Sequence, residues 1–414
     1  MDTTQVPAGY KVTELGVLPQ DWEVAKLGKH VAFRTGPFGS ALHKSDYVPG
    51  GIPIVNPMQI VAGELVPTES MAISKQAAIQ LSDFLLSPGD IVIGRRGEMG
   101  RCAVVEDKND GWLCGTGSMI IKVSKSVNAR YLQRILSSPA VIAAIESTSV
   151  GTTMINLNQS VLGNLIIPLP SPAEQQAIAE ALGEMDALLA AQRARLAKQR
   201  AVKQGLLQGL LSGEQRLPGF VGEWEVRRLG DCLDRIIGGG TPSRSNPKYW
   251  GGKIPWATVK DVMTFHPAST QEYITSEGFA DSSSNMVPKG TLILATRMAV
   301  GHGVIFTVDV AINQDLKALF PSKRLDNKYL FYYLEREQEN IEQIGFGSTV
   351  KGLQLTDLKA IKLMLPLIDE QRAIADVLTE ADAHLAALEA EYAKTQLLKQ
   401  GMMQNLLTGK IRLV

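Results

Sequence analysis

The chain has 414 residues, of which 45% are hydrophobic and 20% are charged, and its 42 basic and 42 acidic residues give a formal net charge of zero. This balance is typical of a folded protein and excludes a disordered chain, which would be poorer in apolar residues. The length predicts about two to four domains. No apolar run reaches the roughly 18–20 residues that span a bilayer, and the N-terminus has no signal-peptide pattern. We therefore expect a soluble cytoplasmic protein.

A long internal repeat organises the chain. Residues 151–217 align without a gap onto residues 347–413, and 30 of these 67 positions are identical. A shorter Trp-Glu-Val element at 22–24 recurs at 224–226. The first long copy continues directly into the second Trp-Glu-Val element, and the last copy would continue into the first one. Because this order is circular, we predict that the two termini lie close together.

The two regions between the repeats, roughly 29–150 and 231–346, differ in sequence but share a predicted order of elements. Short apolar runs bounded by Gly and Pro are typical of strands. Each region has a strand, a hairpin mate, a third strand and a helix, at 91–93, 103–105, 119–123 and 131–137 in the first region and at 292–294, 304–306, 316–320 and 329–336 in the second. We predict that both regions adopt one mixed α and β fold.

Each repeat copy also contains a long helix with an apolar stripe. Apolar residues follow a 4-3-4 spacing from Ile178 to Leu210 and again from Ile374 to Leu406, which indicates a coiled-coil seam. Pro172 suits a first helical turn, and Gly213 and Gly409 suit helix ends. We predict that the two helices pack antiparallel, because each variable region connects directly to one end of a helix.

Four polar residues fall on this seam, namely Gln199, Lys203, Thr395 and Lys399. Polar seam residues lower stability but can fix the register of two helices. The alternative is that these long side chains only extend to water. The sequence leaves both possibilities open.

Familiar catalytic and metal-binding motifs do not occur in the sequence. The three cysteines are widely spaced, the five histidines are isolated, and no GxxxxGK[S/T] loop is present. The segment Asn56-Pro57-Met58-Gln59 begins like an amino-methyltransferase signature but lacks its second proline and its aromatic residue. The segment 115–118 lacks the strand–Ser–helix context of a hydrolase elbow. We therefore expect neither a catalytic centre nor a metal site in this chain.

Basic residues in Gly-rich turns are the better functional signal. Arg96 and Arg297 occupy matching turns of the two variable regions. Such turns let backbone amides and guanidinium groups approach phosphates and base edges. We predict DNA contacts from Phe38, Ser40, Arg95, Arg96, Arg101, Thr241, Ser243, Arg244, Lys260, Arg297, His302 and Lys351. The alternative is a set of surface turns whose arginines pair with carboxylates, and the even charge balance gives no support to a protein that binds DNA alone.

Leu-Pro, Glu-Gln and Ile-Ala pairs followed by Leu appear from Leu169 to Leu182 and again from Leu365 to Leu378. This repeated motif resembles the specificity subunit of type I restriction-modification systems. That family is also similar in two other features: the Lys-Gln-Gly sequence near the end of each long helix, at 203–205 and 399–401, and the loop 347–353. The resemblance covers essentially the whole chain. One departure is the segment 152–156, which matches the 347–353 loop imperfectly.

The resemblance implies an α+β protein with two mixed α/β target recognition domains. They would be separated by a two-helix antiparallel coiled coil in a pseudo-twofold circular arrangement, with boundaries at 1–170, 171–213, 214–366 and 367–414. It implies no catalytic activity in this chain, and partners that are double-stranded DNA, two modification subunits and restriction subunits, with no membrane. S-adenosylmethionine, ATP and Mg²⁺ would bind to the partner subunits, whose activities are adenine methylation and DNA cleavage.

Because the two variable regions differ in sequence, each would read one half of an asymmetric bipartite DNA site. Two identical regions would read a palindrome instead. The competing hypotheses are a scaffold whose coiled coil presents two protein-binding domains, and a methyltransferase that needs no other subunit. The missing cofactor motif argues against the second of these.

Overall fold

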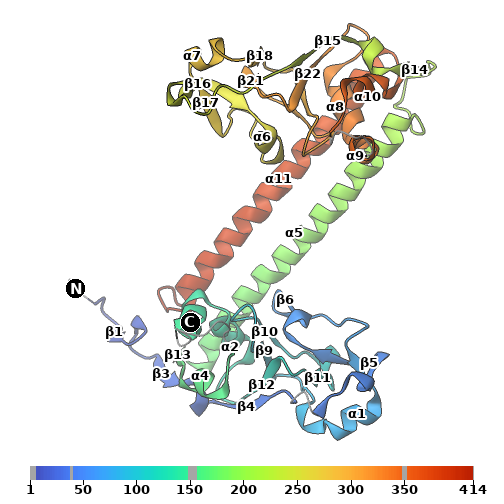
Figure 1. The fold of residues 1–414 in the computed structure, drawn as a ribbon. Coiled ribbons are helices and arrows are strands. Elements are labelled where there is room, and N and C mark those ends of the chain that lie inside the picture. The colour runs from blue at the N-terminus through green and yellow to red at the C-terminus, as the bar shows by residue number, and fades with distance from the viewer. Residues whose placement is uncertain (1–5, 38–40, 148–155, 347–351, 414) are drawn as a thin grey trace. The chain divides into compact units, whose positions relative to one another are not determined.

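The computed structural model describes residues 6–37, 41–147, 156–346 and 352–413, which fall into two compact units. The first unit comprises residues 1–191 and 391–414, and the second comprises residues 192–390 (Figure 1). Each unit contains one variable region and part of both long helices, α5 (Pro172–Ser212) and α11 (Ile368–Leu406). Within the described ranges, no helix combines the length and apolarity needed to cross a membrane.

Two sheets form most of the first unit. The larger sheet is antiparallel in the order β10-β9-β12-β4, and the smaller has the order β11-β5-β8 with β5 and β11 parallel. The strands are β1 (Tyr10–Thr13), β2 (Gly16–Pro19), β3 (Glu23–Lys26), β4 (Val31–Thr35), β5 (Tyr47–Val55), β6 (Ile60–Val61), β7 (Glu64–Leu65), β8 (Ala72–Ile73), β9 (Ile91–Gly94), β10 (Cys102–Val104), β11 (Leu113–Cys114), β12 (Ser118–Val123) and β13 (Ile166–Leu169). The short helices are α1 (Lys75–Gln80), α2 (Ala129–Leu136), α3 (Pro139–Ser147) and α4 (Gln159–Asn164).

The second unit repeats this arrangement. Both of its sheets have four strands: the order β15-β22-β19-β20 corresponds to the larger sheet of the first unit, and the order β17-β16-β21-β18 again contains a parallel pair, β16 with β21. The strands are β14 (Glu225–Arg228), β15 (Leu233–Gly238), β16 (Trp250–Ala257), β17 (Glu272–Ile274), β18 (Asn285–Val287), β19 (Leu292–Ala295), β20 (Gly303–Ile305), β21 (Val310–Ile312), β22 (Leu316–Pro321) and β23 (Lys362–Leu365). The short helices are α6 (Val259–Met263), α7 (Ser276–Ala280), α8 (Asn327–Arg336), α9 (Gln338–Phe346) and α10 (Leu355–Ala360).

The predicted elements of the variable regions are confirmed. The hairpins β9–β10 and β19–β20 are antiparallel, β12 and β22 are the third strands, and α2 and α8 are the helices. The prediction of mixed α and β domains that share a fold is therefore correct. It missed β5 and β16, because these strands contain Gly and Pro and lack an alternating apolar pattern.

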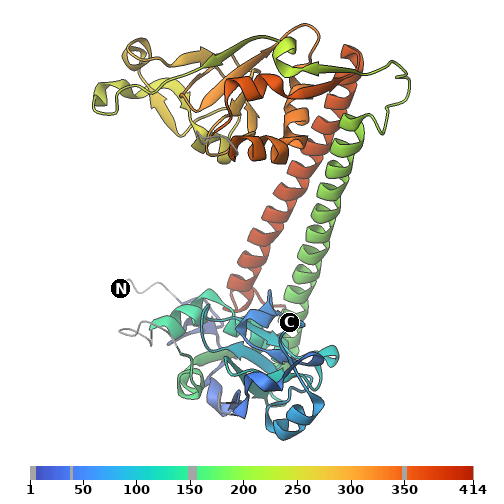
Figure 2. The ribbon, with the colours of Figure 1, turned by 45° about the vertical axis from the view of Figure 1, so that its right-hand side comes forward.

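The long helices are antiparallel, as predicted. In the second unit, ion pairs join Arg200 to Glu389, Lys203 to Asp382 and Arg216 to Glu370. As the residue number rises along α5 and the segment after it, the number of the partner residue on α11 falls. In the first unit, Asp186 of α5 binds Lys399 of α11 at 2.5 Å. Figures 1 and 2 show the two helices side by side. The seam therefore joins the repeat copies in opposite directions.

The two seam lysines have fixed partners rather than free ammonium groups. Lys203, with 14% of its side chain exposed, binds Asp382 at 2.7 Å and Glu335 at 2.8 Å. Burial lowers the pKa of Lys203, but the hydrogen bonds that its ammonium group donates to the two carboxylates outweigh burial and raise the pKa above its ordinary value. The Asp186–Lys399 pair is the equivalent contact in the other repeat copy, because Lys399 and Asp186 lie 196 residues from Lys203 and Asp382, respectively. Since a slip of the helices would separate these charges, the lysines favour one register.

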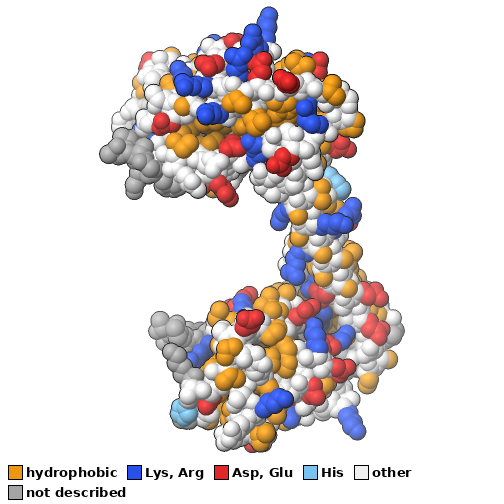
Figure 3. Space-filling view, turned by 90° about the vertical axis from the view of Figure 1, so that its right-hand side faces the viewer, with side chains coloured by type: hydrophobic (Ala, Val, Ile, Leu, Met, Phe, Trp, Pro, Cys, Tyr) orange, Lys and Arg blue, Asp and Glu red, His pale blue; other side chains and the backbone are white. Residues whose placement is uncertain are grey.

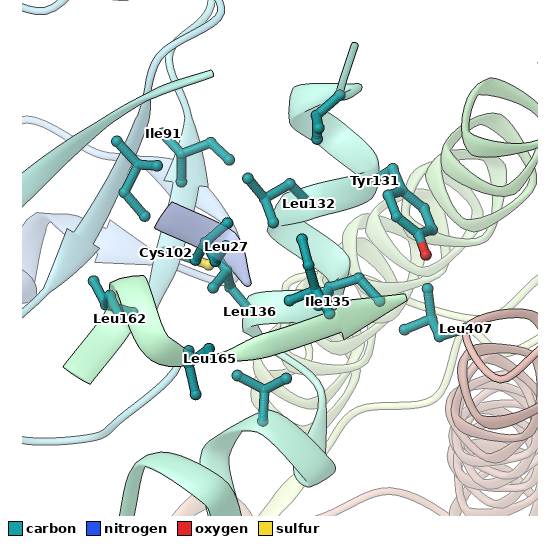
Figure 4. Close-up of a cluster of buried hydrophobic side chains, with 14 of the residues drawn as sticks. Leu27, Ile91, Cys102, Tyr131, Leu132, Ile135, Leu136, Leu162, Leu165 and Leu407 are labelled. Carbon is teal, nitrogen blue, oxygen red and sulfur yellow. The ribbon is translucent and has the colours of Figure 1, made fainter. Parts of the chain in front are cut away.

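The C-terminal segment packs into the first unit beside the N-terminal segment. Leu407, just beyond α11, belongs to the same buried cluster as Leu27 and Tyr131 (Figure 4). The Tyr10 hydroxyl donates a hydrogen bond of 2.9 Å to the backbone oxygen of Gly409. The predicted proximity of the two ends is therefore seen in the described residues of this unit.

A buried glutamate occupies the first position of the repeated Glu-Gln motif. Glu174, whose side chain is fully buried, accepts hydrogen bonds from the Arg412 guanidinium and from Trp22 Nε1, the latter at 2.9 Å. Arg412 also binds Asp21 and lies over the Trp22 ring. The end of one repeat copy is thus bonded to the start of α5 and to the Trp-Glu-Val element.

The equivalent contact between a buried glutamate and an arginine recurs in the second unit, but the neighbouring tryptophan contributes differently. Glu370 is 2% exposed and accepts hydrogen bonds of 2.5 and 2.8 Å from Arg216, which lies over the Trp224 ring at 5.5 Å. Here, however, Trp224 Nε1 is buried without a hydrogen-bond partner in the described structure. Glu370 therefore depends on Arg216 more than Glu174 depends on Arg412.

The glutamine of the motif connects each long helix to its variable domain. Gln175 donates to the Pro170 oxygen at 3.0 Å and accepts from the Asn128 amide at 2.8 Å, just ahead of α2. Gln371 makes the corresponding bonds to Pro366 and Asp326, ahead of α8. These paired bonds fix each variable domain to one end of a long helix.

Candidate nucleic-acid interface

Four loops of the first variable domain meet at the ends of its central strands. We call them the first loop cluster: residues 36–37 after β4, 56–59 after β5, 95–101 after β9 and 115–117 before β12. Hydrogen bonds connect all four, namely Gly36 N to Ser118 O (3.0 Å), Arg95 N to Gly117 O (2.9 Å), Gly117 N to Asn56 Oδ1 (3.1 Å) and Arg101 Nη1 to Pro57 O (3.2 Å). The sheets hold these loops together as one surface.

The second variable domain has the equivalent loops. The second loop cluster comprises residues 239–244 after β15, 258–261 after β16, 296–302 after β19 and 313–315 before β22. Its connecting hydrogen bonds are Gly240 N to Ile312 O (3.1 Å), Asn313 N to Ala257 O (3.1 Å), Thr296 N to Asp315 O (2.8 Å) and Thr241 Oγ1 to Gln314 Oε1 (2.6 Å). Two sequences with little identity therefore form one backbone frame.

The turn after β9 in the first domain and the turn after β19 in the second share their backbone geometry. Its third and sixth positions have left-handed φ angles in both copies, at Gly97 (81°) and Gly100 (75°) and at Met298 (62°) and Gly301 (85°). Arg96 and Arg297 precede these positions at the same step of the turn. The alignment made from sequence thus places the two arginines at equivalent points.

Arg96 is the one arginine of the first turn without a side-chain partner among the described residues. Arg95 is half-buried and its Nε donates to Leu157 O at 3.0 Å, and Arg101 binds Pro57 O and Glu98. The Arg96 side chain is exposed and has no ion-pair partner within the described ranges. Arg96 is therefore the residue of this turn best placed to bind a ligand. The predicted residues Phe38 and Ser40 lie outside the described residues.

In the second loop cluster, Arg297 and Lys260 are exposed cations without a close carboxylate partner among the described residues. Arg297 has 56% of its side chain exposed and lies 3.8 Å from Asp315, a long contact for an ion pair. Lys260 is exposed on α6, and no ion pair to it occurs in the described part of the chain. His302 accepts a hydrogen bond from Gln338, so its ring is held within the domain. The predicted residue Lys351 lies outside the described residues.

Arg244 and the serines beside it have internal partners. The Arg244 guanidinium binds Glu272 through two contacts of 2.5 and 2.8 Å and lies 3.8 Å from the centre of the Trp250 ring. The hydrogen bonds to this partner raise the pKa of Arg244 and lower that of Glu272. Ser243 bonds to Ser245. The alternative expectation, a surface turn whose arginine pairs with a carboxylate, describes Arg244 well.

Sequence reasoning missed two exposed methionines in these clusters. Met58 is 80% exposed and Met298 is 87% exposed. Met58 is the third residue after β5, and Lys260 is the third residue after β16. The two residues therefore occupy equivalent positions. The sequence contains a signal for this equivalence, because Asn56 with Gln59 and Thr258 with Asp261 form matching capping boxes.

Neither a metal centre among the described residues nor a continuous basic patch on the face drawn in Figure 3 marks a binding site. The described residues contain no group of three or more His, Cys, Asp and Glu side chains that could hold a metal ion. On the face shown in Figure 3, basic and acidic side chains are interspersed over both units. Burial raises the pKa of the Cys102 and Cys114 thiols to about 12, so neither is a reactive thiolate near neutral pH.

Comparisons with known proteins identify the family. A family model described as the type I restriction modification DNA specificity domain matches residues 19–198 and 222–399. The chain is 24% identical to the MjaVIII type I restriction enzyme specificity subunit of Methanocaldococcus jannaschii, over 95% of this chain and 94% of that protein. It is 28% identical to the EcoR124I/EcoR124II specificity subunit of Escherichia coli, over 52% of this chain and 55% of that protein.

Solved structures show the same fold. The crystal structure of the S subunit of a type I system from M. genitalium matches with a TM-score of 0.61, at 16% identity, over 93% of this chain and 96% of that chain. Two family matches of this extent agree with the two-copy organisation seen in sequence and structure. The chain therefore belongs to the family of type I restriction-modification DNA specificity subunits, the non-catalytic members of these enzymes.

Proposed function

We propose that each loop cluster reads one half of an asymmetric bipartite site in double-stranded DNA. The observation that carries this proposal is the pairing of one backbone frame with two different sets of exposed side chains. The frame positions of the first cluster present Met58, Arg96 and Gly97, and those of the second present Lys260, Arg297 and Met298. Side chains that face solvent on a common scaffold can change without loss of fold, so they are suited to reading different bases.

We also propose that this chain acts within a larger complex. Two modification subunits would bind it and supply adenine methylation with S-adenosylmethionine, and restriction subunits would supply cleavage with ATP and Mg²⁺. A formal charge of zero supports DNA binding that is shared with partner subunits, because proteins that bind DNA alone are usually basic. One solved structure with this fold, at 21% identity and a TM-score of 0.58, was determined to explain complex assembly in the type I system.

The helices would set the distance between the half-sites. In this proposal residues 1–170 and 214–366 are the recognition domains, and the helices at 171–213 and 367–414 are the spacer. The antiparallel seam and its paired lysines support a spacer of fixed register. A helix of about 41 residues is roughly 60 Å long, enough to hold two readers at separate sites.

A deletion tests the spacer. Removing one heptad from both helices shortens each by about 10 Å and preserves the apolar stripe. We expect the methylated sequence to keep both half-sites and to change only the number of bases between them. Methylation mapping of a host genome that expresses the variant measures this, and unchanged spacing with retained activity would contradict the spacer.

DNA recognition itself is tested on the assembled methyltransferase. The expected result is retention of one bipartite sequence over single-base variants in a competition assay. A chain that assembles with modification subunits but adds no sequence preference would favour the scaffold hypothesis. Binding of S-adenosylmethionine by the isolated chain would instead favour a self-sufficient methyltransferase.

A further inference from the structure

The turn of the second loop cluster contains a residue that its own fold does not explain. Met298 has a φ of 62°, in the left-handed region where a side chain on Cβ is disfavoured. Only one other non-glycine residue in the described ranges, Ala62, has a positive φ. The equivalent position in the first turn is Gly97, with a φ of 81°. Glycine therefore satisfies this turn, and methionine adds strain to it.

Packing does not account for Met298 either. Its side chain is 87% exposed, the highest value among the described methionines. An exposed apolar side chain on a strained backbone contributes nothing to the core and exposes apolar surface to water. Strained residues of this kind concentrate at functional sites, where the strain places a side chain for a ligand. The fold thus presents a thioether outward at the tip of a turn.

The neighbour of Met298 indicates what the thioether meets. Arg297 precedes it and is 56% exposed, and its ion-pair contact among the described residues, with Asp315, is long at 3.8 Å. A turn that presents a guanidinium and an apolar tip side by side is complementary to a surface with both acceptors and apolar groups. In the DNA major groove, guanine presents acceptors and the 5-methyl group of thymine is the apolar feature.

We propose that Met298 packs against the 5-methyl group of a thymine in the second half-site, next to the base contacted by Arg297. This inference rests on the proposed function, since it requires the second loop cluster to face DNA. It makes Met298 a specificity-determining residue that has no counterpart at Gly97. The first cluster presents its own exposed methionine, Met58, from a different loop. The two clusters therefore place their apolar contacts at different points of one frame.

The test uses the full chain assembled with its modification subunits and duplexes that contain its mapped site. Each thymine of the second half-site is replaced in turn by deoxyuridine, which removes only the methyl group. For the wild-type chain, one replacement should weaken binding about fourfold, the effect of one buried methyl-sized group. A second half-site without thymine, or without any position sensitive to deoxyuridine, would overturn the proposal.

Three variants locate the effect. Met298→Gly relieves the strained φ, and Met298→Gln keeps the length and the strain but ends in a polar group. Both should bind the thymine and deoxyuridine duplexes equally, with the melting temperature of Met298→Gly no lower than that of the wild type. The matched control is Val221→Ala, which changes a 94% exposed apolar residue outside the cluster and should keep the fourfold difference. A Met298→Gly protein that still distinguishes the two duplexes would overturn the proposal.

The same experiment separates failure of this inference from failure of the proposed function. If the wild-type assembly prefers a bipartite site but shows no methyl effect, the role of Met298 is wrong and the reading of half-sites stands. If the wild-type assembly shows no sequence preference on any duplex, the proposed function is wrong as well.

Discussion

The two variable domains share their backbone and differ in the side chains that the backbone presents. Both have the same four-stranded sheet, the same parallel pair and the same hydrogen-bonded loops. At equivalent points of the turn and the neighbouring loop, however, the first presents Gly97 and Met58 and the second presents Met298 and Lys260. Positions inside the frame are constrained by packing and hydrogen bonds, whereas exposed positions are free to differ.

The junctions between helix and domain show the opposite pattern. Glu174 and Glu370 are buried together with their glutamine neighbours, and these residues and their partly exposed arginine partners are the same in both copies. A buried carboxylate needs a bonded cation, so substitution there is costly. At these junctions the residues that are identical in both copies hold the structure, whereas the residues that differ between the two loop clusters face solvent.

The largest expected effect is the loss of an arginine at one of these junctions. Arg216→Ala leaves Glu370 buried without its guanidinium and should cost about 3–5 kcal/mol of stability. Arg412→Ala should cost at least about 1 kcal/mol less, because Glu174 keeps the hydrogen bond from Trp22. Hydrogen exchange of each unit, together with thermal melting, measures both. Equal losses would show that the tryptophan contact does not distinguish the two junctions.

A smaller and more local effect is expected at the exposed turn arginine. Arg297→Ala should weaken binding of the assembled methyltransferase by about 1–3 kcal/mol and relax one position of the second half-site only. Its long contact with Asp315 predicts a stability change below about 1 kcal/mol. Arg96→Ala is the matched variant for the first half-site. A uniform loss over all sequences with a flatter salt dependence would instead assign Arg297 to a phosphate.

The smallest effect is expected at Arg244, which we assign to structure. Arg244→Ala removes the contacts with Glu272 and Trp250 and should cost about 1 kcal/mol of stability with no change in the recognised sequence. The lowered pKa of Glu272 means that the pair stabilises the fold above the ordinary value of 4.5 and loses this contribution as pH falls through the lowered value.

Acid unfolding of the wild type and of Arg244→Ala checks the sign of this effect. The difference in stability between them should be present at pH 7 and shrink below pH 4.5. A variant with unchanged stability and altered base preference would return Arg244 to the recognition surface.

Much of the fold follows from local patterns in the sequence. The apolar stripe from Ile178 to Leu210 predicts the long helix, because a packed helix buries one face. The short apolar runs at 91–93 and 292–294 predict the strands, because a central strand is buried along its whole length. The circular repeat predicts the packing of Leu407 near the N-terminal segment. These inferences need only periodicity and self-similarity.

The site is harder to predict because it depends on contacts between distant residues. The parallel pair of β5 and β11 brings together loops about 60 residues apart, and no local pattern shows this. The sequence also cannot tell a paired arginine from a free one. Arg244 has its partner at Glu272 and Arg95 has its partner at Leu157, whereas Arg96 and Arg297 face solvent in similar Gly-rich turns.

The most direct test of the central claim replaces one variable region with the other. A chimera in which residues 231–346 are exchanged for a second copy of residues 29–150 has two identical loop clusters on unchanged helices. Methylation mapping of a host genome that expresses it, with the modification subunits, should show a palindromic site made of two inverted copies of the first half-site. Continued methylation of the original asymmetric site would contradict the claim that each variable domain reads its own half.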